Sequence, residues 1–255
     1  MSPLILVTND DGIEAKGVHE LISALPADAE IICVCPDSPR SAQAMAITVA
    51  TPLRLRRLAD YKGAKMFKVN GTPVDCVKIA IDVVLKRLPD IVVAGINHGS
   101  NAGVNVVYSG TMGAVFEGCA FGVPSVGFSL TSHDPNADFT GCLPFVRKIV
   151  PEVISGGLPQ GVCLNVNIPY IQPYPKEMRV VRACRGKWTD NYDEYVDPFG
   201  DKFYWLTGKF INEEPDDEST DEWCLSHGIV SVVPTMLDRT APHLDRYSRF
   251  NGSIA

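Results

Sequence analysis

Apolar and polar positions alternate along the start of the chain in blocks whose lengths predict a parallel sheet. Residues 4–8 form a short apolar run that ends in polar residues, which is typical of a buried strand. Residues 14–25 then place apolar side chains on one helical face (Val18, Leu21, Ile22, Leu25). Residues 30–35 form a second apolar run. A strand, a helix and another strand in this order indicate a parallel α/β architecture.

The alternation continues as far as residue 130. The pattern predicts a helix over 74–85, because Pro73 stands at an early position that helices tolerate. It also predicts extended segments at 48–58 and 66–69, strands at 91–96 and 125–130, and a helix at 109–121.

After about residue 140 the pattern weakens. A helix is expected over 143–154, interrupted at Pro144 and Pro151, and strands are expected at 162–168, 179–184 and 229–233. Residues 187–206 are rich in aromatic and polar side chains, and no long linker divides the chain. We therefore expect one domain over 1–255. Residues 1–140 would form the α/β core that carries the site, and about 141–255 would complete it and add an irregular C-terminal extension.

Composition narrows the classes of function. The chain has 23 Lys and Arg against 30 Asp and Glu, a net charge of −7, which argues against a protein that binds a nucleic-acid polymer through its backbone. Seven of the acids lie between Glu213 and Glu222, where a solvated loop is favoured over a cation-binding tract.

Two further features concern the environment of the protein. No apolar run approaches the roughly 20 residues of a membrane span, and no secretory signal is recognisable, so we expect no membrane association. The eight cysteines include no Cys-x-x-Cys pair, and we expect their side chains to be reduced and buried. Together these features predict a cytoplasmic protein.

Three polar clusters follow predicted strands, at 9–12, 38–41 and 97–103. Ligands of open parallel sheets bind at the carboxyl ends of the strands. Asp10 and Asp11 repel each other unless a cation lies between them or one is protonated. Asn-Asp-Asp-Gly alone is more often a turn, but beside the other two loops it favours a site for a divalent cation. Ser41 and Asn97 would add neutral oxygens, and an all-oxygen set suits Mg²⁺ or Mn²⁺ rather than Zn²⁺.

The segment 108–111 precedes a predicted helix. Ser109, Gly110 and Thr111 could bind an anion there, or Ser109 could simply cap the helix. A cation and a helix N-terminus in one crevice suggest a phosphate ester as substrate. Weaker candidates are Arg40 for phosphate contact, the aromatic group around Trp188 and Tyr192 for stacking on a base, and three histidines for proton transfer (His98, His133, His227).

Several common motifs are missing from the sequence. It contains no G-x-x-x-x-G-K-[ST], no G-x-G-x-x-G and no G-x-S-x-G. NTPases of the common type, typical dehydrogenases and serine hydrolases are therefore disfavoured.

An ordered set of short motifs between residues 4 and 130 resembles the SurE family of stationary-phase survival proteins, which are 5′/3′-nucleotidases. The matching segments are 5–13 (ILVTNDDGI), 36–37 with 40–41, 70–77 (NGTPVDCV), 95–103 (GINHGSNAG), 108–111 (YSGT), 117–118 and 122–125. Looser matches follow at 165–169 and 230–234, with Asp238. Substitutions occur at 43–46 and 113–116, and no motif covers the acidic segment or the aromatic tract before it.

The resemblance implies a Rossmann-like, mostly parallel sheet flanked by helices, with a C-terminal extension used to form a homodimer or homotetramer. It implies one divalent metal ion per subunit, Mg²⁺ or Mn²⁺, held by Asp10, Asp11, Ser41 and Asn97. Phosphate binding falls on Asn101, Ser109, Gly110 and Thr111. The implied activity is hydrolysis of nucleoside 5′- and 3′-monophosphates, and short polyphosphate is a further substrate of some members.

The leading hypothesis is thus a metal-dependent phosphomonoesterase with Asp10 and Asp11 as catalytic residues. The motif is not the Asp-x-Asp of aspartyl-phosphate enzymes, which favours an activated water over attack by Asp10. One alternative is a nucleotide-binding sensor without turnover, and another is a protein-interaction role for the C-terminal extension. The sequence leaves open the preferred base, the metal and the size of the oligomer.

Overall fold

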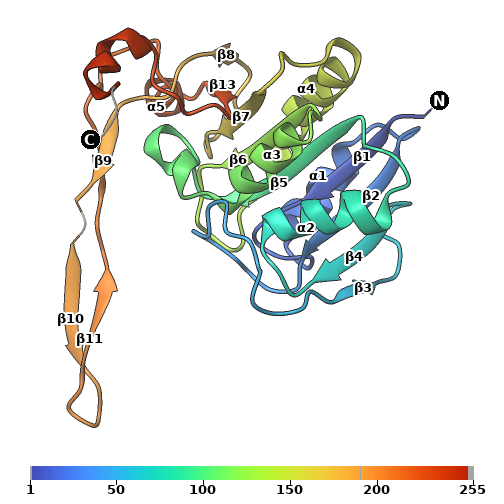
Figure 1. The fold of residues 1–255 in the computed structure, drawn as a ribbon, viewed down its shortest axis with the longest axis horizontal. Coiled ribbons are helices and arrows are strands. Elements are labelled where there is room, and N and C mark those ends of the chain that lie inside the picture. The colour runs from blue at the N-terminus through green and yellow to red at the C-terminus, as the bar shows by residue number, and fades with distance from the viewer. Residues whose placement is uncertain (1, 190, 252–255) are drawn as a thin grey trace.

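One mixed β-sheet organises the protein, for which a computed structural model describes residues 2–189 and 191–251 (Figure 1). Within these residues the sheet has nine strands in the order β3-β4-β2-β1-β5-β6-β7-β13-β8. Their bounds are β1 Leu4–Thr8, β2 Glu30–Pro36, β3 Leu55–Arg57, β4 Lys65–Val69, β5 Ile91–His98, β6 Ser125–Leu130, β7 Val162–Ile168, β8 Met178–Val180 and β13 Val230–Met236.

The centre of the sheet is parallel. Strands β4, β2, β1, β5, β6 and β7 pair in parallel along that order. β3 runs antiparallel to β4 at one edge, and β13 runs antiparallel to β7 and parallel to β8 at the other. The carboxyl ends of the central strands therefore meet along one side of the sheet, where an α/β protein binds its ligand.

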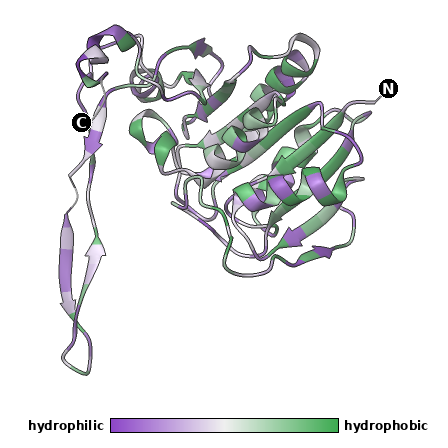
Figure 2. Ribbon diagram, viewed as in Figure 1, coloured by the Kyte–Doolittle hydropathy of each residue, from purple (hydrophilic) through white to green (hydrophobic). Residues whose placement is uncertain are grey.

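Helices cover both faces of the sheet. α1 (Lys16–Ala24) and α4 (Leu143–Gly156) pack on one face, and α2 (Pro73–Ile79) and α3 (Gly110–Ala120) pack on the other (Figure 1). Side chains of β1 alternate between these layers: Ile5 and Val7 join the first core, whereas Leu6 joins the second. Figure 2 shows the resulting concentration of apolar residues on the central strands. The predicted fold class, a mostly parallel sheet flanked by helices, is confirmed.

Two short ladders follow the edge of the sheet. β9 (Gly186–Trp188) pairs antiparallel with β12 (Phe210–Asn212) close to the body of the protein. β10 (Tyr192–Val196) and β11 (Lys202–Leu206) form an antiparallel hairpin that extends away from it (Figure 1). Every residue of these two hairpin strands is exposed. α5 (Asp221–Ser226) then leads the chain back to β13.

The expected interruption of the helix near residue 143 is wrong. α4 runs without a break, because Pro144 lies in the first turn, where its missing N–H would have had no helical partner. Pro151 removes one interior hydrogen bond but is exposed, and the buried stripe of α4 packs against the sheet on both sides of it. In the described ranges, none of the helices combines the length and the hydrophobicity needed to cross a bilayer.

Candidate active site

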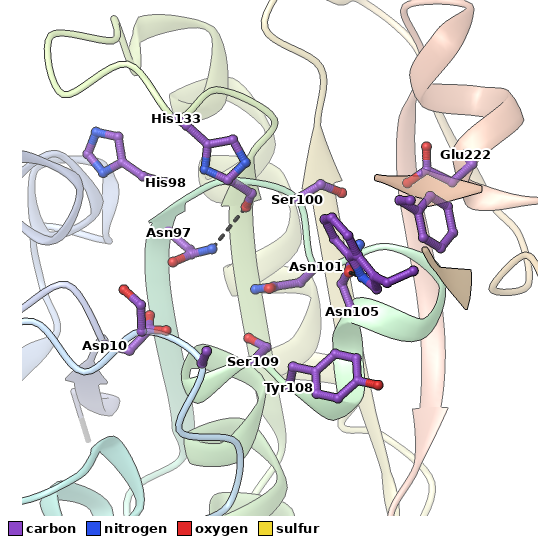
Figure 3. Close-up of a pocket in the computed structure, with 15 residues that line it drawn as sticks. Asp10, Asn97, His98, Ser100, Asn101, Asn105, Tyr108, Ser109, His133 and Glu222 are labelled. Atoms are coloured by element: carbon purple, nitrogen blue, oxygen red, sulfur yellow. Dashed lines mark hydrogen bonds between the residues drawn. The ribbon is translucent and has the colours of Figure 1, made fainter. Parts of the chain in front are cut away.

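A cavity of about 420 Å³ opens beyond the carboxyl ends of β1 and β5 (Figure 3). The loop after β2, the N-terminus of α3 and the β9–β12 ladder complete its walls. Its lining residues are Asp10, Ser41, Ala42, Asn97, His98, Gly99, Ser100, Asn101, Asn105, Tyr108, Ser109, His133, Trp188, Phe210 and Glu222. Residues from 10 to 222 therefore meet in one place.

Asp10 is a buried carboxylate at the base of this cavity, with only 4% of its surface exposed. The hydroxyl of Thr111 donates a hydrogen bond to its Oδ1. Gly110 permits this contact, because a Cβ there would lie 2.9 Å from both Cβ and Oδ2 of Asp10. Burial, reinforced by the charge of Asp11, raises the pKa of Asp10 to about 6. A cation beside Asp10 would reverse this effect and keep the group ionised.

Asp11 lies beside the end of β5 rather than in the cavity lining. Its Oδ2 accepts a hydrogen bond of 3.2 Å from the backbone N–H of His98 and lies 3.5 Å from Nδ1 of the same residue. The ring of His98 packs edge-on against Phe139, with the ring centres 4.9 Å apart. The contact with the His98 backbone ties the first polar loop to the third.

Asn97 is oriented by the backbone around it. Its Nδ2 donates to the carbonyl oxygen of Gly99 at 2.9 Å, so Oδ1 faces the side on which Asp10 lies (Figure 3). Ser41 lines the cavity from the loop after β2, which a 2.7 Å hydrogen bond from the N–H of Arg40 to the carbonyl of Asp10 holds in place. The Arg40 side chain turns instead to Asp37, 3.6 Å away.

A buried polar network supports the loop that carries Asn101. The N–H of Asn101 donates to Oδ1 of Asn167 at 2.8 Å, and its Nδ2 donates to Ser129 at 2.8 Å. Its carbonyl accepts from Asn165 at 2.8 Å. The two β7 asparagines alternate along that strand and so share one face. Sequence reasoning missed this support, although the polar positions at spacing two in an apolar strand were a usable signal.

The N-terminus of α3 points into the same region. Ser109 caps the helix, because its hydroxyl accepts a 3.1 Å hydrogen bond from the N–H of Met112. Ser109 also lines the cavity, whereas Gly110 and Thr111 contact Asp10 from behind. The geometry thus brings Asp10, Ser41, Asn97, Asn101 and Ser109 to the cavity surface. Gly110 and Thr111 instead contact Asp10, and Asp11 lies outside the lining.

An aromatic wall faces this polar group. Trp188 is 39% exposed, and its indole N–H donates to Oδ1 of Asn105 at 2.9 Å. Its ring centre lies 6.1 Å from that of Phe210 on the paired strand. Tyr192 belongs to the distant hairpin and does not join this wall. Asn105, Phe210 and Glu222 were missed from the sequence, because only the fold brings their separate segments together.

The segment Glu213–Glu222 is more structured than the predicted solvated loop. Glu214 forms ion pairs with Arg182 and Arg185, and Asp217 pairs with Arg182. These contacts, led by Arg182, lower the pKa of Glu214 to about 2. Asp221 is fully buried and accepts hydrogen bonds from three backbone N–H groups. The prediction of a solvated loop is therefore wrong for Glu214 and Asp221, whereas Glu213, Asp216 and Glu218 are exposed as predicted.

Of the two remaining histidine candidates, one lines the cavity and the other does not. His133 lines the cavity beside Gly99. His227 is remote from it and stacks on Trp223, with ring centres 3.9 Å apart.

The chemistry of the donor set fits a hard cation. Asp10, Asp11, Ser41 and Asn97 offer only oxygen atoms, and Asn97 is fixed with its oxygen toward Asp10. Across residues 2–189 and 191–251, no group of three or more His, Cys, Asp or Glu side chains forms an alternative metal site. Two carboxylates with neutral oxygens suit Mg²⁺ or Mn²⁺.

Comparison with known proteins gives a consistent result. The family model described as "Survival protein SurE" matches residues 5–190. A protein named 5′-nucleotidase SurE from Phocaeicola vulgatus is 48% identical over 239 residues, covering 94% of this chain and 93% of its own length. A protein of the same name from Bacteroides fragilis is 47% identical over 241 residues, covering 94% of both chains.

A solved structure is also similar throughout. The crystal structure of the SurE protein from Aquifex aeolicus superposes with a TM-score of 0.83 at 33% sequence identity. The match covers 97% of this chain and 99% of that one.

Proposed function

The chain belongs to the SurE family, and on this premise we propose that it hydrolyses nucleoside 5′-monophosphates to nucleoside and phosphate. The curated relatives carry the name of that activity, and the site has the matching chemistry. Activity on 3′-monophosphates is a further part of the proposal.

One observation carries the proposal: an oxygen-rich cluster and a helix N-terminus meet at the carboxyl edge of the sheet. Asp10 and Asn97 lie at the ends of β1 and β5, and Ser109 begins α3 beside them. Carboxylates alone would repel a phosphate, whereas carboxylates around a cation and a positive helix end attract one. The aromatic wall leaves room on the other side for the nucleoside.

We assign the metal ligands to Asp10, Asp11, Ser41 and Asn97, for one divalent ion per subunit, Mg²⁺ or Mn²⁺. When bound, the ion supplies positive charge that offsets the charge of the phosphoryl group and polarises its oxygens. The protein residues position the ligands of the metal and the phosphate. Thr111 holds Asp10 through its hydroxyl, and the Asn167 network fixes the backbone of Asn101 beside the substrate phosphate.

Asp10 and Asp11 are the proposed catalytic residues, and water is the proposed nucleophile. The oxygen of water forms a bond to phosphorus and the water gives up a proton, while the ester P–O bond breaks and the leaving oxygen takes up a proton. The products are the nucleoside and inorganic phosphate. We assign phosphate binding to Asn101, Ser109, Gly110 and Thr111, through side chains at the cavity surface or the first N–H groups of α3. Trapping of a phosphorylated Asp10 would overturn the role given to water.

The direct test measures phosphate release from a panel of 5′- and 3′-nucleoside monophosphates with Mn²⁺, with Mg²⁺ and with EDTA. We expect metal-dependent release that EDTA abolishes, and a loss of about 10²-fold or more in Asp10→Asn. Asp28→Asn removes an exposed carboxylate away from the cavity and serves as the matched control. A folded protein that binds nucleotides without releasing phosphate would favour the sensor function.

We propose that residues 1–255 make one domain that assembles as a homodimer or homotetramer. β7, β13 and β8 complete the sheet that β1 begins, which supports a single unit. The β10–β11 hairpin exposes aromatic side chains on strands with no buried face (Tyr192, Tyr195, Phe203, Tyr204, Trp205), a surface suited to a second copy of the chain. Light scattering should show the oligomer, and Phe203→Ser with Trp205→Ser should dissociate it. A monomeric parent protein would contradict this.

We also propose a cytoplasmic location. All eight cysteines are buried and free, as expected in a reducing compartment. Cell fractionation with a specific antibody tests the location directly.

A further inference from the structure

Glu222 lies across the cavity from Asp10, on the wall built by the C-terminal segment (Figure 3). It stands in the first turn of α5, directly after Asp221. The phosphoryl group is assigned to the side of Asp10, so Glu222 faces the part of the substrate that carries the base.

The backbone of Glu222 is fixed while its side chain is free. Its N–H donates to Oδ1 of Asp221 at 2.8 Å, and Asp221 is in turn anchored by the N–H groups of Gly103 and Cys184, each at 2.8 Å. The carboxylate of Glu222 is half-buried and has neither a hydrogen bond nor an ion pair with any residue in the described parts of the chain. A half-buried acceptor at a cavity wall with no partner of its own is suited to a ligand that donates hydrogen bonds.

The neighbouring side chains suit a flat heterocycle. Trp188 and Phe210 are cross-strand neighbours on the β9–β12 pair, with their rings tilted by 59° and the ring centres 6.1 Å apart. The indole N–H of Trp188 donates to Asn105 at 2.9 Å. This hydrogen bond fixes the plane of the Trp188 ring, so a base can stack on it without first ordering the side chain. The edge of a stacked base would then form hydrogen bonds with Glu222, which lines the same cavity.

We propose that Glu222 determines base specificity and selects guanine, an inference that rests on the proposed nucleotidase function. An ionised carboxylate only accepts hydrogen bonds and has two parallel oxygens. Guanine presents two adjacent donors, N1–H and the N2 amino group. Hypoxanthine offers only N1–H, and adenine places the acceptor N1 beside its amino group, where it faces a carboxylate oxygen. The order of preference is therefore GMP, then IMP, then AMP.

The test compares kcat/KM for GMP, IMP and AMP in the parent protein and in Glu222→Gln. The parent should favour GMP over AMP by about 10- to 100-fold, because a site built to pair donors rejects a base that lacks them. A glutamine amide donates and accepts, which matches adenine. Glu222→Gln should therefore lower kcat/KM for GMP by about 10-fold or more, mainly through KM, and reverse the preference toward AMP.

Two controls separate this role from a general loss of function. Glu218→Gln removes the same charge from an exposed position in the same segment and should leave the base preference unchanged. Hydrolysis of p-nitrophenyl phosphate, which has no base, should change far less than hydrolysis of GMP in Glu222→Gln. Equal effects on all three nucleotides, or a parent protein without preference for GMP, would overturn the proposal.

A binding measurement keeps the inference testable even if the proposed activity fails. Calorimetry with guanosine and adenosine in EDTA needs neither the metal nor turnover. Tighter binding of guanosine that Glu222→Gln reverses supports the role of Glu222, and equal binding of both nucleosides overturns it. Absence of phosphate release from every substrate would overturn the nucleotidase function alone.

Discussion

The buried carboxylate of Asp221 accepts a hydrogen bond of 2.8 Å from the backbone N–H of Gly103, 118 residues earlier in the chain. Its other oxygen accepts from the N–H of Cys184, also at 2.8 Å. A Cβ on Gly103 would lie 2.9 Å from Sγ of Cys184, so a larger residue at position 103 would clash with that side chain. Asp221 therefore joins the loop after β5 to the wall that carries Trp188 and Glu222.

Asp221→Asn should destabilise the protein by about 2–3 kcal/mol. An amide retains one acceptor oxygen but directs an N–H₂ group at a backbone donor, which leaves a buried group unsatisfied. Urea unfolding followed by fluorescence gives the change in the free energy of unfolding. Asp216→Asn, at an exposed position of the same segment, should change it by less than about 0.5 kcal/mol. Equal stability of the two variants would contradict the structural role of Asp221.

Asn167 and Ser231 lie opposite each other on β7 and β13, and their removal should have opposite consequences. Asn167→Ala leaves the N–H of Asn101 without its acceptor, so we expect a loss of about 1–3 kcal/mol in stability and reduced phosphate release. Ser231 is fully buried, and its hydroxyl has no partner among the described residues. Ser231→Ala should therefore be neutral or stabilising. Thermal unfolding of both variants decides the matter, and a destabilised Ser231→Ala would show that the hydroxyl has a partner.

Gly110→Ala should reduce kcat by about 10²-fold while the protein remains folded. The new Cβ would lie 2.9 Å from Asp10 and 3.3 Å from the carbonyl of Arg40, so Asp10 must shift. Small displacements of a catalytic group lower the reaction rate strongly. A Cβ on Gly156, at the end of α4, would meet no atom within 4 Å, and Gly156→Ala should be fully active. Phosphate-release assays on both variants provide the comparison. Full activity of Gly110→Ala would mean that Asp10 is not the sensitive group.

Metal binding should weaken as the pH falls below about 6. Burial and the charge of Asp11 raise the pKa of Asp10 from 3.8 to about 6 in the metal-free protein. Between these values the folded protein retains a proton that the unfolded chain has released, so this group favours the folded state at low pH and disfavours it above pH 6. A bound cation requires the ionised form, and its affinity should fall about tenfold per pH unit below the pKa.

The increase in Tm caused by Mn²⁺ measures this coupling. It should be large at about pH 8 and small at about pH 5, because protons compete with the metal for Asp10. An increase that is the same at both values would show that Asp10 is not a ligand. Asp28→Asn should behave as the parent protein at each pH.

The sequence predicted those elements that have a continuous buried face. β1 and β6 match the expected residues, because an apolar run between turn signals has few alternatives. The hairpin β10–β11 was missed, since strands exposed on every residue show no apolar alternation. α4 was predicted with breaks, because the packing of its apolar stripe on the sheet cannot be judged from Pro151 alone.

The site divides along similar lines. Asp10 and Asn97 could be placed together because the carboxyl ends of neighbouring parallel strands share one edge. Phe210 and Glu222 could not, since their position depends on the β9–β12 pair and on the Asp221 contacts. Local sequence patterns predict the site residues that follow neighbouring strands of one sheet. The positions of the other site residues depend on contacts between distant segments.

The two ends of the cavity are encoded in separate stretches of the chain, which has an evolutionary consequence. Asp10, Ser41, Asn97 and Ser109 lie between residues 10 and 109, whereas Trp188, Phe210 and Glu222 lie between residues 188 and 222. Under the proposed roles, mutations in the later stretch would change which nucleoside is accepted without altering the groups assigned to phosphate binding. The range of nucleosides would then change, in evolution or by design, independently of the residues assigned to metal and phosphate binding.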